Sequence, residues 1–302
     1  MSKKITLGII SFYLIILGAL FYFHHQQVTD AKQPPIRVAT SLNFYGEVAQ
    51  SVAGKYGDVT SFINSAAVDT HDFQPSNKQA QQLAEANVVI ENGLGYDTWL
   101  QKMTKSTDHE QTVINVGRTV AHKKAGDNEH VWYQPSTMSD LATKLAQKYA
   151  KLDPKHRAYY YARARRYQKQ LAPLNKTIAQ AKHGVDPQRN VVLVSEPVFD
   201  YALDNLGYRI ANQRFAKAVE DDNDPSPKEI AAMQSAIRQR RVAFFVNNKQ
   251  ESNSTIKNML KLARQYDVPV LNVTETKPDH QTYTEWMQTQ YQQLIKIQEQ
   301  GE

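Results

Sequence analysis

The stretch VVIENGLGYDTWLQK, residues 88–102, decides the fold class of this chain. Residues 88–92 form a short run rich in β-branched apolar side chains, which predicts a buried strand. Gly93-Leu94-Gly95 follows as a tight turn, and residues 96–102 have a helical pattern. A buried strand that leads through a turn into a helix is the repeating unit of an α/β fold with a parallel sheet.

Strands and helices alternate in the same way on both sides of this stretch. The other predicted strands are residues 36–41, 59–63, 112–116, 190–194, 242–246 and 268–273. The other predicted helices among them are residues 44–53, 76–86, 197–206, 227–238, 252–266 and 281–300. A helix at about 135–152 and a long helix at 154–182, which Pro173 can kink, separate the two sets. The sequence therefore predicts an α/β fold of two lobes, each a parallel-type sheet with flanking helices, joined by one long backbone helix.

The N-terminal segment, residues 1–27, has membrane character. Lys3 and Lys4 precede residues 5–23, which carry no charge and are rich in Ile, Leu, Phe and Tyr. This run reaches the lower end of the roughly 17–25 residues that span a bilayer, and it lacks the small residues that suit a cleavage enzyme. We therefore predict an uncleaved signal anchor, with a cleaved signal peptide as the alternative. Either one places the rest of the chain on the extracytoplasmic face of the plasma membrane.

The predicted elements divide the remainder of the chain into four parts. Residues 28–35 are a polar tether that ends in Pro34-Pro35. An N-terminal lobe at 36–152, a linking backbone helix at 153–183 and a C-terminal lobe at 184–302 follow it.

The composition excludes several classes of protein. The chain has 302 residues, of which 41% are hydrophobic and 22% charged, as in a soluble globular protein. The net charge is +6, but Lys and Arg are mixed with Asp and Glu, so nucleic-acid binding is not indicated. The basic cluster at residues 163–166 is interpreted as the solvated face of a helix. The absence of cysteine excludes disulfides, thiolate metal sites and cysteine nucleophiles.

The common signatures of nucleotide-binding proteins and hydrolases are missing from the sequence. It contains no GxxxxGK[ST] loop, and Gly93-Leu94-Gly95 lacks the third glycine of a dinucleotide fingerprint. It contains neither Gly-x-Ser-x-Gly nor His-Glu-x-x-His. The two glycines are therefore interpreted as part of a turn.

Two histidines and two glutamates lie in loops next to the predicted strands and helices. His71 and His130 belong to the N-terminal lobe, and Glu196 and Glu275 directly follow strands of the C-terminal lobe. Because α/β sheets place ligand sites at this edge, the four side chains are predicted to converge on one cleft between the lobes. Each residue alone could equally cap a helix or lie on the surface, and the matched placement of two per lobe carries the prediction. Two imidazoles and two carboxylates suit Zn²⁺, Mn²⁺ or Fe²⁺ and disfavour Cu⁺, which prefers sulfur.

Several multi-residue motifs of the chain resemble those of one known family. They are HDFQPS at residues 71–76, NGLGYDTWL at 92–100, NEHVW at 128–132 and DPSPKE at 224–229. In these motifs, and over about residues 36–293, the chain resembles the zinc/manganese class of ABC-transporter solute-binding proteins, the cluster A-I or TroA-like family. Thr70 and Glu129, which precede the two histidines, stand where the family has proline.

The resemblance implies a solute-binding protein without catalytic activity. Members of this family hold a metal ion between two α/β lobes, with little hinge motion, and dock onto a permease. For this chain the implied ligands are His71, His130, Glu196 and Glu275, the cargo is one divalent transition metal, and the partner is the permease of an ABC metal importer. We expect a monomer that is attached to the membrane by its N-terminal segment, which replaces the family's usual lipid-anchor cysteine.

The resemblance also bears on which metal is bound. Manganese-type members have Glu as the third ligand in a Ser-Glu-x-x-Phe-x-Tyr setting, and residues 195–201 read SEPVFDY. Zinc-type members carry a His-rich loop before the second ligand, where this chain has only His122. Both features favour Mn²⁺, with Zn²⁺ as a close second, because oxygen ligands favour manganese relative to three imidazoles. Glu275 stands where the family usually has Asp, which leaves the identity of the metal open.

Two alternative functions remain at this point. A metal held by two histidines and one carboxylate can activate water, so an extracytoplasmic metallohydrolase is one of them. A fourth protein ligand and the lack of an evident general base argue against it. The other alternative is a surface adhesin with the same fold.

Overall fold

The computed structural model describes residues 34–66, 68, 70, 73–251 and 253–300. The chain divides into two units, residues 1–35 and Ile36–Glu302, and the described helices and strands all belong to the second unit. The predicted anchor at residues 5–23 lies outside the described residues, and so does His71. None of the helices in the described ranges is both long and apolar enough to cross a membrane.

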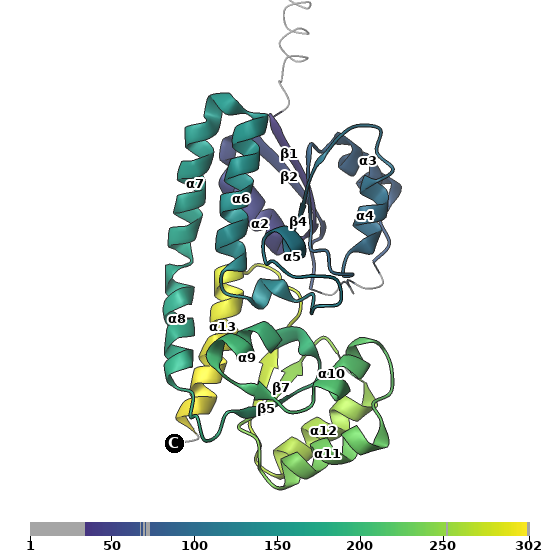
Figure 1. Cartoon of the computed structure of the whole chain (residues 1–302), viewed down its shortest axis with the longest axis vertical. Coiled ribbons are helices and arrows are strands. Elements are labelled where there is room, and N and C mark those ends of the chain that lie inside the picture. Colours follow the sequence, from purple (N-terminus) through teal and green to yellow (C-terminus); the bar gives the residue numbers. More distant parts are fainter. Residues whose placement is uncertain (1–33, 67, 69, 71–72, 252, 301–302) are drawn as a thin grey trace, which may run out of the picture. The chain divides into compact units, whose positions relative to one another are not determined.

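The first sheet contains four parallel strands in the order β2-β1-β3-β4 (Figure 1). They are β1 (Ile36–Leu42), β2 (Gly57–Ile63), β3 (Val88–Glu91) and β4 (Thr112–Asn115). Each strand leads into a helix: α2 (Asn43–Ala53), α3 (Asn77–Glu85), α4 (Thr98–Thr104) and α5 (Val116–Thr119). Successive side chains of β1 point to opposite faces of the sheet. Val38 belongs to the hydrophobic core that includes α2, whereas Ala39 belongs to a second core that includes α3 and α4. Both faces of this sheet are therefore covered, as its continuous apolar strands predict.

The second sheet repeats this connectivity, with four parallel strands in the order β6-β5-β7-β8. They are β5 (Val191–Val194), β6 (Arg209–Ile210), β7 (Phe245–Asn248) and β8 (Val270–Val273). The helices of this half are α9 (Asp200–Leu206), α10 (Gln213–Glu220), α11 (Pro227–Arg238), α12 (Ser254–Gln265) and α13 (Tyr283–Glu299). Two parallel sheets with flanking helices confirm the predicted fold class.

The structure departs from the sequence prediction in three places of the second half. The two-residue strand β6 and the helix α10 were not predicted. The strand predicted at residues 242–246 lies instead at Phe245–Asn248. Asn247 and Asn248 have the composition of a turn, yet both are buried at the end of this strand, because their amides find partners there.

The connection between the sheets is helical, as predicted, but it is interrupted once. It consists of α6 (Thr137–Leu152), a 3₁₀ turn at Pro154–His156, α7 (Arg157–Gln170) and α8 (Ala172–His183). The break falls at Leu171, two residues before Pro173, which lacks an N–H and whose ring excludes the carbonyl group four residues earlier. The predicted long helix is thus two helices, α7 packed against α6 and α8 packed against α13.

One hydrophobic core is shared by both sheets. The ring centroid of Phe44 lies 5.2 Å from that of Trp132 and 5.5 Å from that of Trp286. The ring centroids of Tyr133 and Phe199 are 5.0 Å apart. These rings come from α2, from the segment after α5, from α13 and from the segment after β5, and all five are buried. Such ring pairs add about 0.5–1.5 kcal/mol each beyond simple burial. The shared core therefore resists a hinge motion of one half against the other.

The unit Ile36–Glu302 contains all the parts that a folding domain requires. Its described sheets and helices are built from residues between Ile36 and Glu299, and the buried residues of its three hydrophobic cores lie between Ile36 and Leu294. It is a compact unit by itself. A domain with its own complete core folds independently, so a chain that begins at Pro34 is suitable for solution experiments.

Candidate metal site

His130 is the central residue of the candidate site. It precedes the 3₁₀ turn Val131–Tyr133, and only 1% of its side chain is exposed. Its ring Nδ1 lies 2.8 Å from Oδ1 of Asn128, and this oxygen also accepts a hydrogen bond from the His130 backbone N–H. The Nδ2 of the same amide donates to the carbonyl of Pro197 at 2.6 Å. The orientation of the amide is thereby fixed, so Nδ1 carries the proton and Nε2 carries the lone pair.

Glu275 faces the Nε2 side of this imidazole. It follows strand β8, and its Oε1 lies 4.0 Å from His130 Nε2. The same oxygen accepts hydrogen bonds from the hydroxyl groups of Tyr96, at 2.6 Å, and Thr70, at 3.2 Å. The carboxylate from the second sheet is thus held by two hydroxyl groups from the first half of the chain.

Glu196 lies in a carboxylate-rich environment after strand β5. Its Oε2 accepts a hydrogen bond of 2.8 Å from the amide of Asn248. Burial, together with the negative charges of Glu275, Glu251 and Glu220, raises the pKa of the Glu196 carboxyl to about 8, against the opposing effect of the Asn248 hydrogen bond. A carboxyl that is buried among other carboxyls is relieved by a bound cation.

His71 stays a prediction, because it lies outside the described residues. Its neighbour in the sequence, Thr70, is described and is 3% exposed. The hydroxyl of Thr70 donates to Glu275. Of the four predicted ligands, the structure therefore brings His130 next to Glu275 and places Glu196 within electrostatic reach of Glu275.

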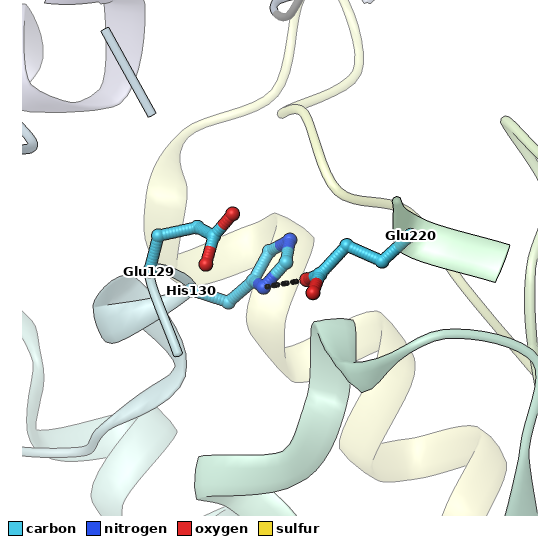
Figure 2. Close-up of side chains that lie close together, drawn as sticks. All are labelled: Glu129, His130 and Glu220. Atoms are coloured by element: carbon cyan, nitrogen blue, oxygen red, sulfur yellow. Dashed lines mark ion pairs between the residues drawn. The ribbon is translucent and has the colours of Figure 1, made fainter. Parts of the chain in front are cut away.

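Glu220 is a functional candidate that the sequence did not reveal. It ends α10, its side chain is 7% exposed, and its Oε1 lies 3.6 Å from His130 Nδ1. Its other oxygen pairs with Lys217 at 2.8 Å. Figure 2 shows His130 between the carboxylates of Glu129 and Glu220, and one ligand atom from each of the three lies within 4.8 Å of the other two. This group of three could hold a cation on the Nδ1 side, but Nδ1 is already engaged by Asn128.

The site as a whole is rich in carboxyl groups whose ionisation is suppressed in the metal-free protein. Burial and the charge of Glu129 raise the pKa of Glu220 to about 7, against the opposing effect of Lys217. Burial likewise raises the pKa of Asp200 to about 7, with a contribution from Glu220. Several carboxyl groups thus surround one imidazole in a poorly hydrated region. This arrangement can bind a divalent cation with nitrogen and oxygen ligands.

The sequence matches one protein family over most of its length. The model of the family described as ZnuA, zinc-uptake complex component A, periplasmic, matches residues 38–297. The iron-binding protein YfeA of Yersinia pestis is 20% identical over 231 residues, which are 74% of this chain and 73% of the relative. The manganese ABC transporter substrate-binding lipoprotein PsaA of Streptococcus pneumoniae is 19% identical over 285 residues, 89% of this chain and 88% of the relative.

A third relative is longer than this chain. The zinc-binding protein AdcA of Streptococcus pyogenes is 24% identical over 294 residues, which cover 87% of this chain and 54% of the relative. The chain therefore spans about half of the length of AdcA. The names of the three relatives specify iron, manganese and zinc, so the relatives share metal binding but not one metal.

Solved structures with the same fold are metal-binding proteins. The Mn-bound periplasmic metal-binding protein of Candidatus Liberibacter asiaticus has a TM-score of 0.72 at 17% identity and covers 87% of this chain and 99% of its own. The solute-binding protein FpvC of Pseudomonas aeruginosa, in complex with Ni²⁺, has a TM-score of 0.72 at 18% identity over 88% of this chain and 98% of its own. At this identity the likeness establishes the two-lobed fold. The family match over residues 38–297 shows that the chain belongs to the ZnuA family, zinc-uptake complex component A, periplasmic.

Proposed function

We propose that this chain is an extracytoplasmic, monomeric solute-binding protein that captures one divalent transition-metal ion and delivers it to the permease of an ABC importer. The observation that carries the proposal is the approach of His130 Nε2 to Glu275 Oε1, 4.0 Å apart, from the two halves of the molecule. The distance is too long for a direct hydrogen bond, whereas a metal ion about 2.1 Å from each atom fits between them. The family match supports the same function.

The proposed ligands are His71, His130, Glu196 and Glu275. His130 contributes Nε2, because Asn128 holds the proton on Nδ1. The carboxylate of Glu196 is oriented by a hydrogen bond from Asn248. That of Glu275 is oriented by hydrogen bonds from Tyr96 and Thr70. A site whose ligands are held before the ion arrives binds it tightly without a large rearrangement.

Mn²⁺ is the proposed cargo, with Zn²⁺ as the close second. Two carboxylates favour manganese relative to a site with three imidazoles. Zn²⁺ binds most nitrogen and oxygen sites more tightly than Mn²⁺, so affinity alone does not identify the transported ion.

Transport without catalysis is favoured over a metallohydrolase. The proposed site has four protein ligands, whereas a catalytic zinc site commonly has three and keeps the fourth position for water. The adhesin alternative requires an exposed ligand surface, for which the described residues offer no specific observation. Adjacent genes for a permease and an ATPase would favour transport over both alternatives.

The test is calorimetric titration of the metal-stripped domain, residues 34–302, with Mn²⁺ and with Zn²⁺ at neutral pH. We expect one ion per chain for each metal and loss of binding in His130→Ala. His183→Ala, which changes an exposed histidine at the end of α8, is the matched control and should bind as the wild type does. If neither ion binds the wild-type domain, the proposed function is wrong.

A further inference from the structure

The basic residues of the chain are concentrated in the α6–α8 segment. This segment, residues 137–183, contains eleven Lys and Arg and two acidic residues, Asp140 and Asp153, which gives it a formal charge of +9. Because the whole chain carries +6, the remaining residues sum to −3. The segment is therefore an exception to the mixed charges of the rest of the chain.

One end of this segment, the turn between α6 and α7, combines exposed cations with an exposed apolar side chain. Four cations of this turn and of the neighbouring 3₁₀ turn Gly54–Tyr56 are exposed: Lys55, Lys151, Lys155 and Arg157. Leu152 lies among them with 41% of its surface exposed. None of the four cations forms an ion pair with a carboxylate in the described part of the chain. We refer to these five residues as the basic tip.

The two turns that carry the basic tip pack against each other, and Asp153, the acidic residue of the turn between α6 and α7, is buried. The ring of Tyr56 stacks on that of His156 with centroids 3.7 Å apart, which joins the two turns. Asp153 is 9% exposed, pairs with His156 at 2.6 Å and accepts a hydrogen bond from Tyr160. Its charge is therefore engaged inside the protein and does not neutralise the outer surface.

The chain enters the folded unit beside the basic tip. Strand β1 begins at Ile36, and Ile36 is the register partner of Gly57, the residue that follows Tyr56. Neighbouring strands lie about 4.8 Å apart, so the first residue of the unit is adjacent to the tip. In Figure 1, β1 starts at the same end of the unit as the turn between α6 and α7.

The sequence limits how far this end can lie from a membrane. The uncharged run ends at residue 23, and twelve residues, 24–35, separate it from Ile36. Twelve extended residues reach at most about 40 Å. If residues 5–23 are inserted in a bilayer, this length keeps the first residue of the folded unit within about 40 Å of the surface of that bilayer.

We infer that the basic tip is a docking surface for anionic phospholipid headgroups, so that the folded unit contacts the outer face of the bilayer with this end. Four unpaired cations match the charge of an anionic surface, and each contributes about 1 kcal/mol near such a surface. Leu152 supplies the apolar contact that interfacial segments place between headgroups. The inference rests on the proposed extracytoplasmic location, but it is independent of the identity of the metal.

The test is flotation of the domain, residues 34–302, with vesicles of phosphatidylcholine containing about 30% phosphatidylglycerol, compared with pure phosphatidylcholine vesicles, at low salt. We expect binding to the anionic vesicles only, weakened by added salt. Lys151→Glu with Lys155→Glu should reduce binding at least about tenfold, because two attractive charges become repulsive. Leu152→Ser should reduce it by a few-fold.

The matched control reverses two exposed lysines at the far end of the same helical connection. Lys176→Glu with Lys182→Glu makes the same change in net charge on α8 and should leave vesicle binding within about twofold of wild type. Metal titration of each variant checks that the fold is intact and tests the proposed function separately. Equal binding to both kinds of vesicle, or an equal loss in the two charge-reversed pairs, would overturn the inference. Binding to a soluble glycerol-phosphate polymer without binding to vesicles would assign the tip to a polyanion and would also overturn it.

Discussion

His130 Nε2 lies 4.0 Å from Glu275 Oε1, and each of these atoms belongs to a side chain that other groups hold in place. Asn128 fixes the ring of His130, and the hydroxyl groups of Tyr96 and Thr70 fix the carboxylate of Glu275. The hydrogen bonds from Tyr96 and Thr70 to Glu275, and that from the Asn128 amide to the Pro197 carbonyl, also join the two halves of the molecule. The site is therefore oriented before an ion arrives, and small changes in its supporting residues should be measurable as changes in affinity.

Asn128→Ala should lower metal affinity by roughly 10–100-fold without removing a ligand. The amide fixes the proton on Nδ1 of His130 and ties this loop to the carbonyl of Pro197. Without it, Nε2 carries the proton in part of the population and must lose it before the metal binds. Calorimetry of Asn128→Ala measures the effect, and Asn175→Ala on the exposed face of α8 is the control. Unchanged affinity in Asn128→Ala would show that the amide does not set the ring's protonation.

Glu196→His should shift the preference between metals toward Zn²⁺ by about tenfold or more. The substitution replaces an oxygen ligand with imidazole, which zinc favours more strongly than manganese does. The ratio of the two dissociation constants, measured by competition with a chelator, gives the result. Glu196→Gln serves as the control, because it removes the charge without supplying a nitrogen ligand. An unchanged ratio in Glu196→His would mean that residue 196 is not a ligand that discriminates between the metals.

The metal-free domain should lose stability as the pH rises from about 5 to 8. The pKa of Glu196 is about 8 in the folded state, and those of Glu220 and Asp200 are about 7. Each of these three pKa values is higher in the folded state than in the unfolded state. At a pH between the unfolded and folded values, the folded state therefore binds more protons than the unfolded state. The free energy of unfolding consequently falls as pH rises through this interval.

Urea unfolding at a series of pH values measures this dependence. Glu220→Gln and Asp200→Asn should each flatten it, because an amide has no proton to lose. Glu229→Gln is a useful comparison, since the pKa of this exposed capping residue is lowered and its effect is confined to acidic pH. Stability that is constant or rises between pH 5 and 8 would contradict the raised pKa values.

The fold could be read from the sequence because its strands are buried on both faces. Residues 88–90 are Val-Val-Ile and are fully buried, and such continuous apolar runs between helices are specific to parallel sheets. The turn at Gly93 and Gly95 was also predicted from the sequence. In the structure both residues have positive φ angles, 77° and 106°, which glycine adopts more readily than other residues.

The surroundings of His130 could not be read in the same way. Glu220 lies on α10, a helix of eight residues with Phe215, Ala216 and Val219 as its buried side chains. Asn212, at the start of α10, does not cap it but bonds to the backbone of Val194 at 2.7 and 3.0 Å. Without a capping signal or a long apolar stripe, nothing local predicts this helix, and its approach to His130 depends on packing between distant segments. A carboxylate at position 220 would have looked like part of an exposed acidic stretch.

Binding of Mn²⁺ at pH 7 should release about one proton from Glu196. With a pKa of about 8, this carboxyl is about nine-tenths protonated at that pH in the metal-free protein, and the metal binds only the carboxylate form. Calorimetry in buffers of different ionisation enthalpy gives the number of protons released, because the observed enthalpy changes in proportion to it. We expect the number to fall toward zero by about pH 9 and to be lower by about one in Glu196→Gln at pH 7. Glu110→Gln, a change at an exposed position, should leave it unaltered. Equal proton release from the wild type and Glu196→Gln would assign the released proton to another group and contradict the raised pKa of Glu196.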